Sequence, residues 1–291
     1  MTTNSSATLL VPAIRAAVRA GEPILEVYGS ELQVEYKDDR SPLTLADTRS
    51  HAVIAAGLAD TGIPVLSEEG RDIPFAERSR WRRLWVVDPL DGTKEFVKRL
   101  GEFTVNIALV EEGRPQLGAV FVPVTNRLYF GALGEGAFRL DDPQTIAALR
   151  APGPTGKPAE VLARLKAAAT RLPLDTADHS PFVIVGSRSH ATDELHAFVE
   201  EKRRELGAVE FISAGSSLKY CLVAEGAADV YPRLGPTMEW DTAAGQAVVE
   251  AAGARLVRWD TGEPMTYNKP DLLNPWHVVH RNPARRPRRP A

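Results

Sequence analysis

The segment 85–96, Trp-Val-Val-Asp-Pro-Leu-Asp-Gly-Thr-Lys-Glu-Phe, constrains the fold of this chain most strongly. Its apolar, β-branched run ends at Asp88, a second acid follows at Asp91, and a Gly-Thr pair then precedes residues that can begin a helix. This pattern predicts a strand, a rigid turn and a helix N-terminus, where backbone N–H groups can bind an anion. Because two carboxylates would repel an anion, the pattern also implies bound cations. The alternative is an ordinary turn, since Asp-Pro and Asp-Gly are common turn dipeptides.

Acidic residues also stand at the ends of other predicted elements. Glu68 and Glu69 follow a short apolar strand, where adjacent carboxylates repel each other unless they are solvated or share a cation. Asp47 lies near the start of one predicted helix, and Asp241 directly precedes another. The alternatives are a solvated strand end for the two glutamates, an acid in the first helical turn for Asp47 and a helix N-cap for Asp241.

Four of these acids form an all-oxygen set drawn from three strand or helix ends: Glu68, Asp88, Asp91 and Asp241. Oxygen ligands with positions left for water suit Mg²⁺, which binds through few carboxylates plus substrate phosphate. Several carboxylates around one phosphate favour two or more cations about 4 Å apart, of which one activates the attacking water and another neutralises the leaving oxygen. The set therefore predicts metal-assisted hydrolysis of a phosphate ester.

Hydrophobic periodicity predicts helices and strands in alternation through both halves of the chain, which favours an α/β or α+β fold. The helices are expected at 8–19, 41–58, 159–170, 193–206, 214–226 and 242–252. Besides the strand that ends at 88, strands are expected at 32–36, 63–70, 103–111, 116–124, 127–132, 182–186, 209–213, 228–231, 255–259 and 277–280. The three strands from 103 to 132 predict an antiparallel meander. Pro23 predicts a kink or break in the first helix near Gly21.

The chain is expected to form one unit, 1–291, with two halves. We expect a metal-binding α+β half at about 7–139 and a substrate-binding α/β half at about 181–280. Between them, residues 140–180 are rich in Pro, Ala, Gly and Asp and are interpreted as an insertion or linker. Residues 281–291 carry five Arg among three Pro and are expected to be disordered.

Composition narrows the class of protein further. A net charge of −3 shows no basic excess of the kind that nucleic-acid binding requires. One cysteine, Cys221, excludes an intramolecular disulfide and fits a reducing compartment. No run approaches the ~20 apolar residues of a membrane-spanning helix, and the N-terminus lacks the charged-then-apolar order of a signal peptide. We therefore expect a cytoplasmic protein without a transmembrane segment.

Three motifs surround the acids: Ser67-Glu68-Glu69, the run 88–93 and the run 240–244. Together they resemble the motifs of the inositol monophosphatase family of Li⁺-sensitive, Mg²⁺-dependent phosphatases. The longer stretches 88–96, 101–106, 215–219, 231–233 and 235–237 resemble the bacterial 3'(2'),5'-bisphosphate nucleotidases of that family. The resemblance covers residues 7 to 280 and implies a layered αβαβα sugar-phosphatase fold. Its departures, at Pro23, at 140–180 and in the Arg-rich tail, touch none of these motifs.

The resemblance assigns a role to each matching position. The metal-binding groups would be Glu68, Asp88, Asp91, Asp241 and the Leu90 carbonyl, which together would hold two or three Mg²⁺ ions. Thr93, hydrogen-bonded to Asp47, would orient and activate the attacking water, with Glu68 assisting. The N–H groups of Gly92 and Thr93 would receive the scissile phosphate. Asp47, Glu68 and Thr93 are thus the expected catalytic residues.

The resemblance also implies a substrate-binding set: Glu68, Leu90, Asp91, Gly92, Thr93, His190, Ser216, Ser217, Lys219, Arg233 and Asp241. Lys219 and Arg233 would bind a second phosphate through charge-assisted contacts. One of the two serines would donate further hydrogen bonds, and His190 would stack on adenine. A sugar monophosphatase would not need this second anionic subsite.

The leading interpretation is hydrolysis of adenosine 3',5'-bisphosphate to AMP and phosphate, with the sulfated analogue PAPS as a further substrate that yields APS. The resemblance places this reaction in sulfur assimilation. One alternative is an inositol monophosphatase or a fructose-1,6-bisphosphatase-like activity. Another is a non-catalytic nucleotide- or RNA-binding protein that uses the Arg-rich tail. The expected partner is a small-molecule nucleotide, while an oligomer and peripheral association with the inner face of the cell membrane stay open.

Overall fold

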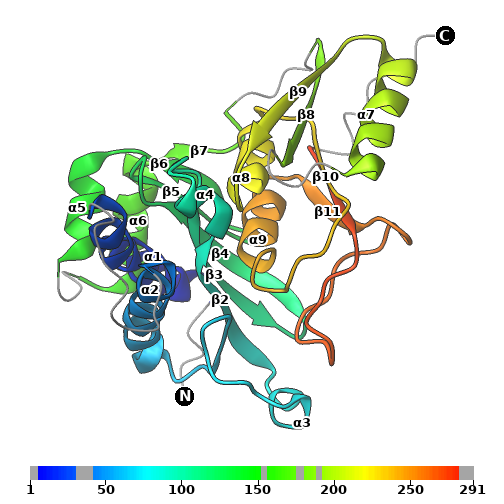
Figure 1. Cartoon of the computed structure of the whole chain (residues 1–291). Coiled ribbons are helices and arrows are strands. Elements are labelled where there is room, and N and C mark those ends of the chain that lie inside the picture. The colour runs from blue at the N-terminus through cyan, green and yellow to red at the C-terminus, as the bar shows by residue number, and fades with distance from the viewer. Residues whose placement is uncertain (1–5, 31–41, 152–155, 175–179, 188–191, 282–291) are drawn as a thin grey trace.

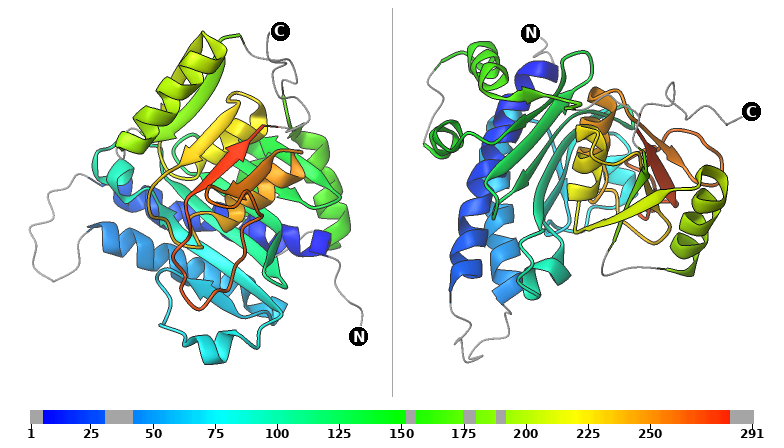
Figure 2. Two further views of the ribbon diagram at one scale, coloured as in Figure 1. Left: turned by 90° about the vertical axis from the view of Figure 1, so that its right-hand side faces the viewer. Right: turned by 90° about the horizontal axis from the view of Figure 1, so that it is seen from above.

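Two β-sheets alternate with three layers of helices in this protein (Figures 1 and 2). The computed structural model describes residues 6–30, 42–151, 156–174, 180–187 and 192–281. The helices are α1 Ser6–Gly29, α2 Pro42–Leu58, the 3-10 helix η1 Ala59–Thr61, α3 Phe75–Arg78, α4 Thr93–Val97, α5 Pro143–Arg150, α6 Pro158–Ala168, α7 Asp193–Leu206, α8 Leu218–Glu225 and α9 Ala243–Ala251. The strands are β1 Val65–Ser67, β2 Arg83–Asp91, β3 Thr104–Glu111, β4 Arg114–Val122, β5 Arg127–Ala132, β6 Gly136–Leu140, β7 Thr170–Arg171, β8 Phe182–Ser187, β9 Val209–Ala214, β10 Val230–Arg233, β11 Arg255–Arg258 and β12 His277–His280.

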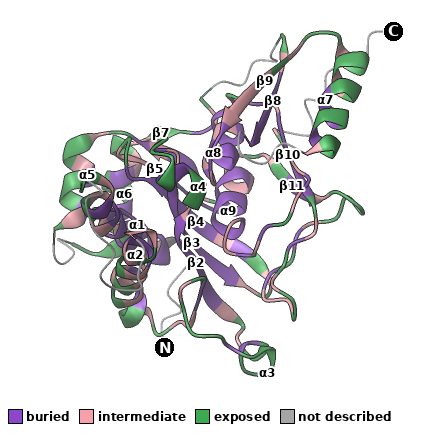
Figure 3. Cartoon of the chain, in the orientation of Figure 1, coloured by how far each residue is buried: buried purple, intermediate pink, exposed green. Residues whose placement is uncertain are grey.

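The layers follow one another in the order predicted by the family resemblance. The pair α1 and α2 covers one face of a seven-stranded sheet, α8 and α9 lie between that sheet and a five-stranded sheet, and α7 covers the outer face of the second sheet (Figure 2). Figure 3 shows that the sheets and α9 are largely buried, whereas α5 and α7 carry exposed outer faces. The layered αβαβα fold is therefore confirmed.

The seven-stranded sheet has the order β1-β2-β3-β4-β5-β6-β7. β1 runs parallel to β2, and each later strand pairs antiparallel with its predecessor. Side chains alternate across the sheet, so that Trp85 and Val87 lie in the core under α1, while Leu84 and Val86 lie in the core under α8 and α9. The predicted antiparallel meander is confirmed, and it continues into β6 and β7, which the sequence patterns did not predict.

Residues 140–180 are not a plain linker. They contain α5, α6 and β7, and both helices pack against α1. Pro143 and Pro158 occupy the first turn of α5 and α6, where proline is favourable because its missing N–H would have no helical partner. Apolar side chains such as Ile146 and Leu162 then join the core under α1. The predicted helix at 159–170 is thus present, at Pro158–Ala168.

Of the kink or break expected near Gly21, the break is absent: α1 continues through Pro23 to Gly29. Ile24, directly after the proline, is fully buried in the core, so packing offsets the missing backbone hydrogen bond. Gly21 lies against Phe121 of β4, where a Cβ atom would come within 2.6 Å of the ring. This close approach holds the proline-containing turn of α1 on the sheet.

On the other face of the sheet, α9 approaches most closely at Gly118 of β4. A Cβ atom on Gly118 would lie 2.5 Å from the Ala244 carbonyl oxygen and 2.9 Å from Ala247 Cβ. Because α9 begins just after Asp241, this contact also sets where that acid lies.

Gly118→Ala is expected to lower the free energy of unfolding by about 1–3 kcal/mol, the usual cost of overpacking. The cause is that the nearest atom belongs to the backbone of α9, which cannot turn aside as a flexible side chain could. Denaturant unfolding measures the change. Gly29→Ala is the matched control, since no atom lies within 4 Å of a Cβ at Gly29. Equal, small effects in both variants would contradict the close packing.

The five-stranded sheet has the order β11-β12-β10-β8-β9, with β8 parallel to β9 and β10 and with β12 antiparallel to β10 and β11. Leu195, Phe198 and Val199 of α7 pack on its outer face. Among the described residues, no helix has the length and apolar character needed to cross a membrane. The predicted strand at 32–36, His190 and the Arg-rich tail beyond 281 lie outside the described residues.

Candidate active site

The C-terminal end of β2 forms the centre of the candidate site. β2 continues past its apolar run to Asp91, with a register shift against β3 between Asp88 and Asp91. Such a bulge changes the direction in which side chains point. The Leu90 N–H donates a hydrogen bond to Asp88 Oδ1 at 3.0 Å, and Gly92, with a φ of 98°, leads into α4. The predicted strand, turn and helix start are therefore present.

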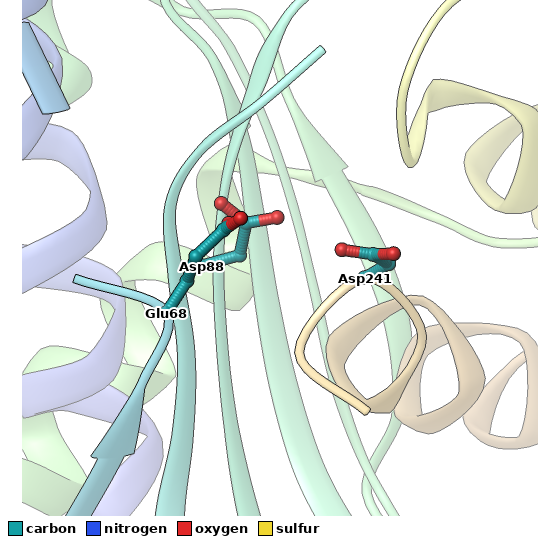
Figure 4. A group of neighbouring side chains, drawn as sticks. All are labelled: Glu68, Asp88 and Asp241. Carbon is teal, nitrogen blue, oxygen red and sulfur yellow. The ribbon is translucent and has the colours of Figure 1, made fainter. Parts of the chain in front are cut away.

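Three carboxylates from distant parts of the chain meet beside this turn (Figure 4). One oxygen each of Glu68, Asp88 and Asp241 lies within 4.8 Å of the others. Glu68 reaches the site because β1 runs parallel to β2, with Ser67 paired to Val87, so that both strands end at the same edge. Asp241 comes from the turn before α9 and faces the other two acids across the gap. The structure thus brings together acids that are up to 173 positions apart in the chain.

Asp91 is held by several hydrogen bonds. Its Oδ2 accepts from Ser217 Oγ at 2.8 Å and from Asn106 Nδ2 at 3.2 Å. This position of Ser217 differs from the expected substrate contact, because the side chain is fully buried and its hydroxyl is directed at Asp91. Asn106 was not among the predicted site residues, although a polar residue in the otherwise apolar strand β3 is a signal that could have found it.

The carboxylate of Asp241 does not cap a helix. Thr242 occupies the N-cap position of α9, and Asp241 Oδ2 instead accepts a hydrogen bond from the Met238 N–H at 2.8 Å. The Asp241 N–H donates in return to the Met238 carbonyl at 3.2 Å. A tight turn therefore fixes the carboxylate within reach of Glu68 and Asp88.

Asp47 lies on α2 and is 8% exposed. Its Oδ1 is buried and has no hydrogen-bond partner among the described residues. The expected hydrogen bond from Thr93 to Asp47 is not among the hydrogen bonds of the described residues, and Thr93 lies at the exposed start of α4. α2 also supports the site through Ser50, whose Oγ donates to the Pro89 carbonyl at 2.8 Å.

Burial and mutual repulsion raise the pKa values of the clustered acids. Burial, reinforced by two nearby glutamates, raises the pKa of Asp47 to about 8. Burial and the neighbouring Asp91 raise the pKa of Asp241 to about 7. The pKa of Asp88 is well above its usual value because burial is reinforced by four neighbouring acids. A divalent cation would relieve this repulsion, and the oxygen donors present are those that Mg²⁺ prefers, so the residues fit a metal site.

Without metal, the thermal stability of the protein is expected to fall as pH rises. The carboxyl pKa values of Asp47 and Asp241 are higher in the folded protein than in the unfolded chain, so the folded state binds more protons. The stabilisation that these two protonated carboxyl groups contribute is fully present below about pH 4. It is lost as pH rises through about 7 to 8. In chelator, Tm should therefore fall between about pH 5.5 and about pH 8.5. Excess Mg²⁺ should reduce this fall, and Asp47→Asn should make it shallower. A Tm that rises over this range in chelator would contradict the interpretation.

A pocket of about 290 Å³ opens beside the acids and is lined from both halves of the chain. Predicted site residues among its lining are Asp91, Gly92, Thr93, Ser216, Lys219, Arg233 and Asp241. Tyr231, Ser187 and Thr237 also line it, and none of them was among the predicted site residues, although Tyr231 and Thr237 lie in stretches that carry the family resemblance. The pocket therefore joins the acid cluster to the cationic side chains of Lys219 and Arg233, and Lys94 also lines it.

Lys219 and Arg233 make different hydrogen bonds. Lys219 is 4% exposed, and its Nζ donates to the carbonyls of Ser216 at 2.7 Å and Ala214 at 3.4 Å. Burial lowers the pKa of Lys219 to about 8. Arg233 Nη2 donates to the Pro236 carbonyl at 2.8 Å, while its buried Nε has no hydrogen-bond partner among the described residues. Arg233 lines the pocket, so its guanidinium can contact a ligand there.

Comparison with known proteins agrees with this geometry. The model of the inositol monophosphatase family matches residues 6–285. The 3'(2'),5'-bisphosphate nucleotidase CysQ of Salmonella typhimurium is 43% identical over 273 residues, which cover 92% of this chain and 97% of the relative. CysQ of Escherichia coli strain K12 is 44% identical over 265 residues, covering 89% and 94%. The crystal structure of CysQ from Bacteroides thetaiotaomicron matches with a TM-score of 0.85 at 46% identity, covering 96% of this chain and 98% of that one. This chain belongs to the inositol monophosphatase family.

Proposed function

We propose that this chain is a Mg²⁺-dependent 3'(2'),5'-bisphosphate nucleotidase that hydrolyses adenosine 3',5'-bisphosphate to AMP and phosphate, the activity for which its CysQ relatives are named. The observation that carries the proposal is a single pocket that joins the acid cluster to Lys219 and Arg233. A substrate with two phosphates fits this arrangement, because one can be bound through cations at the acids and the other by the two side chains.

The residues proposed to hold Mg²⁺ are Glu68, Asp88, Asp91, Asp241 and the Leu90 carbonyl. All of them offer oxygen, and three of the carboxylates each place one oxygen within 4.8 Å of the others. Bound Mg²⁺ would acidify water and offset negative charge on the phosphate oxygens. Two or three ions are proposed, since four carboxylates carry more charge than one divalent cation balances.

Protein groups around the acids would orient the reacting phosphate and water. The Gly92 and Thr93 N–H groups stand where the chain enters α4 and line the pocket, so they can donate to the scissile phosphate. Asp47 and Thr93 are proposed to contact the attacking water separately, since no direct hydrogen bond joins them in the described chain. Ser217 and Asn106 would keep Asp91 in one orientation throughout.

Lys219 and Arg233 are proposed to bind the second phosphate. The ammonium of Lys219 has three N–H donors and uses two on backbone carbonyls, which leaves one for an anion. A phosphate beside Lys219 would also keep it protonated, because an opposite charge raises the pKa of an amine. The guanidinium of Arg233, which lines the same pocket, supplies further donors.

Phosphate release from four substrates, each titrated with Mg²⁺, tests the proposal. They are adenosine 3',5'-bisphosphate, PAPS, inositol 1-phosphate and fructose 1,6-bisphosphate. We expect the highest kcat/KM for adenosine 3',5'-bisphosphate and no release in chelator. A higher kcat/KM for either sugar phosphate would overturn the substrate assignment, and release without divalent metal would overturn the metal assignment.

A further inference from the structure

Glu239 is a fully buried carboxylate two residues before Asp241. Its Oε2 accepts a hydrogen bond from the Asn268 N–H at 2.6 Å. Its Oε1 accepts from the Lys269 N–H at 3.0 Å and from Lys269 Nζ at 2.5 Å. A buried carboxylate is costly unless it is paired and hydrogen-bonded, so these contacts account for its burial. They also attach the turn that carries Asp241 to a segment 30 residues later in the chain.

That later segment, 268–274, holds the Asp241 turn at both ends. Asn274 Nδ2 donates to the Met238 carbonyl at 2.7 Å and to Thr242 Oγ1 at 2.9 Å. Asp241 lies between these two residues, so the Asn274 side-chain amide is hydrogen-bonded to the residues on both sides of Asp241 in its turn. Because the Asp241 carboxylate is itself bonded to the Met238 N–H, a shift of the turn would move the carboxylate as well.

The same segment is also attached to α3, the helix that follows Glu68 in the chain, by Arg78. Arg78 is 3% exposed, and its guanidinium donates to the carbonyls of Lys269 at 2.5 Å and Pro270 at 2.8 Å. It also donates to Asn268 Oδ1 at 3.0 Å. α3 follows β1 and Glu68 in the chain. Segment 268–274 therefore contacts both the element after Glu68 and the turn of Asp241.

We propose that Glu239 is a positioning residue for Asp241, acting through its buried contacts with Lys269 and Asn268. The proposal rests on the Mg²⁺ site proposed above and adds residues that lie outside it. Neither Glu239 nor Lys269 lines the pocket, so they would act on metal affinity through Asp241 and not on the substrate directly. Loss of a group that holds a metal ligand in place typically weakens metal binding by roughly 10- to 100-fold.

Glu239→Gln tests the proposal, because it removes the charge and keeps the size of the side chain. The apparent Kd for Mg²⁺, taken from the rise of Tm with Mg²⁺ in the absence of substrate, should increase roughly 10- to 100-fold. The KM for adenosine 3',5'-bisphosphate at saturating Mg²⁺ should stay within about twofold of wild type. Lys269→Arg should keep most of the Mg²⁺ affinity because it keeps the cation, whereas Lys269→Met should weaken it as Glu239→Gln does.

Glu225→Gln is the matched control. Glu225 is also buried and accepts hydrogen bonds from Tyr129 OH at 2.7 Å and Arg139 Nη1 at 2.9 Å, beside β5 and β6 and away from the acids. It should lower Tm without changing the Mg²⁺ affinity. If Glu239→Gln also lowered Tm and kept wild-type Mg²⁺ affinity, its role would be purely structural and the proposal overturned. If Glu239→Gln does not fold, Lys269→Met is measured in its place. Weaker Mg²⁺ binding by Lys269→Met would then support the proposal, and a lowered Tm with wild-type Mg²⁺ affinity would overturn it.

A wild-type protein whose Tm does not rise with Mg²⁺ would overturn the metal site itself, and the positioning role with it. A wild-type protein that binds Mg²⁺ but prefers another phosphate ester would overturn only the substrate assignment. The role of Glu239 would then be judged by Mg²⁺ affinity alone. The thermal measurement thus separates a failure of this inference from a failure of the proposed function.

Discussion

Asp88→Asn is expected to lower kcat/KM for adenosine 3',5'-bisphosphate by about 10³-fold or more, because metal ions supply several kcal/mol of charge stabilisation in the transition state. Asp88 is 1% exposed and lies among four other acids, at the centre of the proposed metal site. The amide keeps the shape of the side chain and can still accept the hydrogen bond from the Leu90 N–H. It removes one of the negative charges that would hold the cations. Steady-state phosphate release at saturating Mg²⁺ measures the effect.

The same variant is expected to remain folded without metal and to be as stable as wild type or slightly more stable. The reason is that the substitution removes like-charge repulsion from a buried cluster. Thermal unfolding in chelator measures this. Asp60→Asn, at an exposed acid of η1, is the control and should change neither activity nor stability. A large loss of metal-free stability in Asp88→Asn would show that the acid is structural.

The acid cluster could be predicted from the sequence because two of its members follow apolar runs with clear strand patterns. The apolar run of β2 ends at Asp88, and Glu68 comes directly after the short apolar strand β1. Parallel pairing of the two strands then brings the ends together. Asp241 is different, since no local pattern says that the start of α9 faces the first sheet. Its place in the set depended on the family motif at 240–244.

The partners of individual side chains could not be predicted in the same way. Ser217 and Lys219 lie two positions apart in one polar stretch, yet Ser217 is buried against Asp91 while Lys219 reaches the pocket. Which of them meets the substrate depends on how α8 is rotated against β3, and that is decided by tertiary packing. The Thr93–Asp47 hydrogen bond was implied only by the family resemblance, and among the described residues Asp47 Oδ1 has no hydrogen-bond partner.

Arg233→Met is expected to lower kcat/KM for adenosine 3',5'-bisphosphate roughly 10- to 100-fold, since a hydrogen bond to a charged group is worth about 1.5–3 kcal/mol. The effect on 3'-AMP, which lacks the 5'-phosphate, should be much smaller. The charged guanidinium of Arg233, which lines the pocket, is the donor lost, and Met keeps much of the side chain's length without its charge. Lys219→Met should act in the same direction, with an added loss of stability because Lys219 Nζ also bonds to two backbone carbonyls.

The ratio of kcat/KM for adenosine 3',5'-bisphosphate to kcat/KM for 3'-AMP distinguishes a lost contact with the second phosphate from a general disturbance of the pocket. Loss of the Arg233 contact to the Pro236 carbonyl could disturb the pocket, but such a disturbance would slow both substrates alike. Only a lost contact with the second phosphate lowers the ratio. Arg255→Met, at an exposed arginine of the same sheet, is the matched control and should leave the ratio unchanged. Equal losses on both substrates in Arg233→Met would remove the physical basis for a second phosphate site, and with it the reason to prefer a bisphosphate nucleotide over a sugar phosphate.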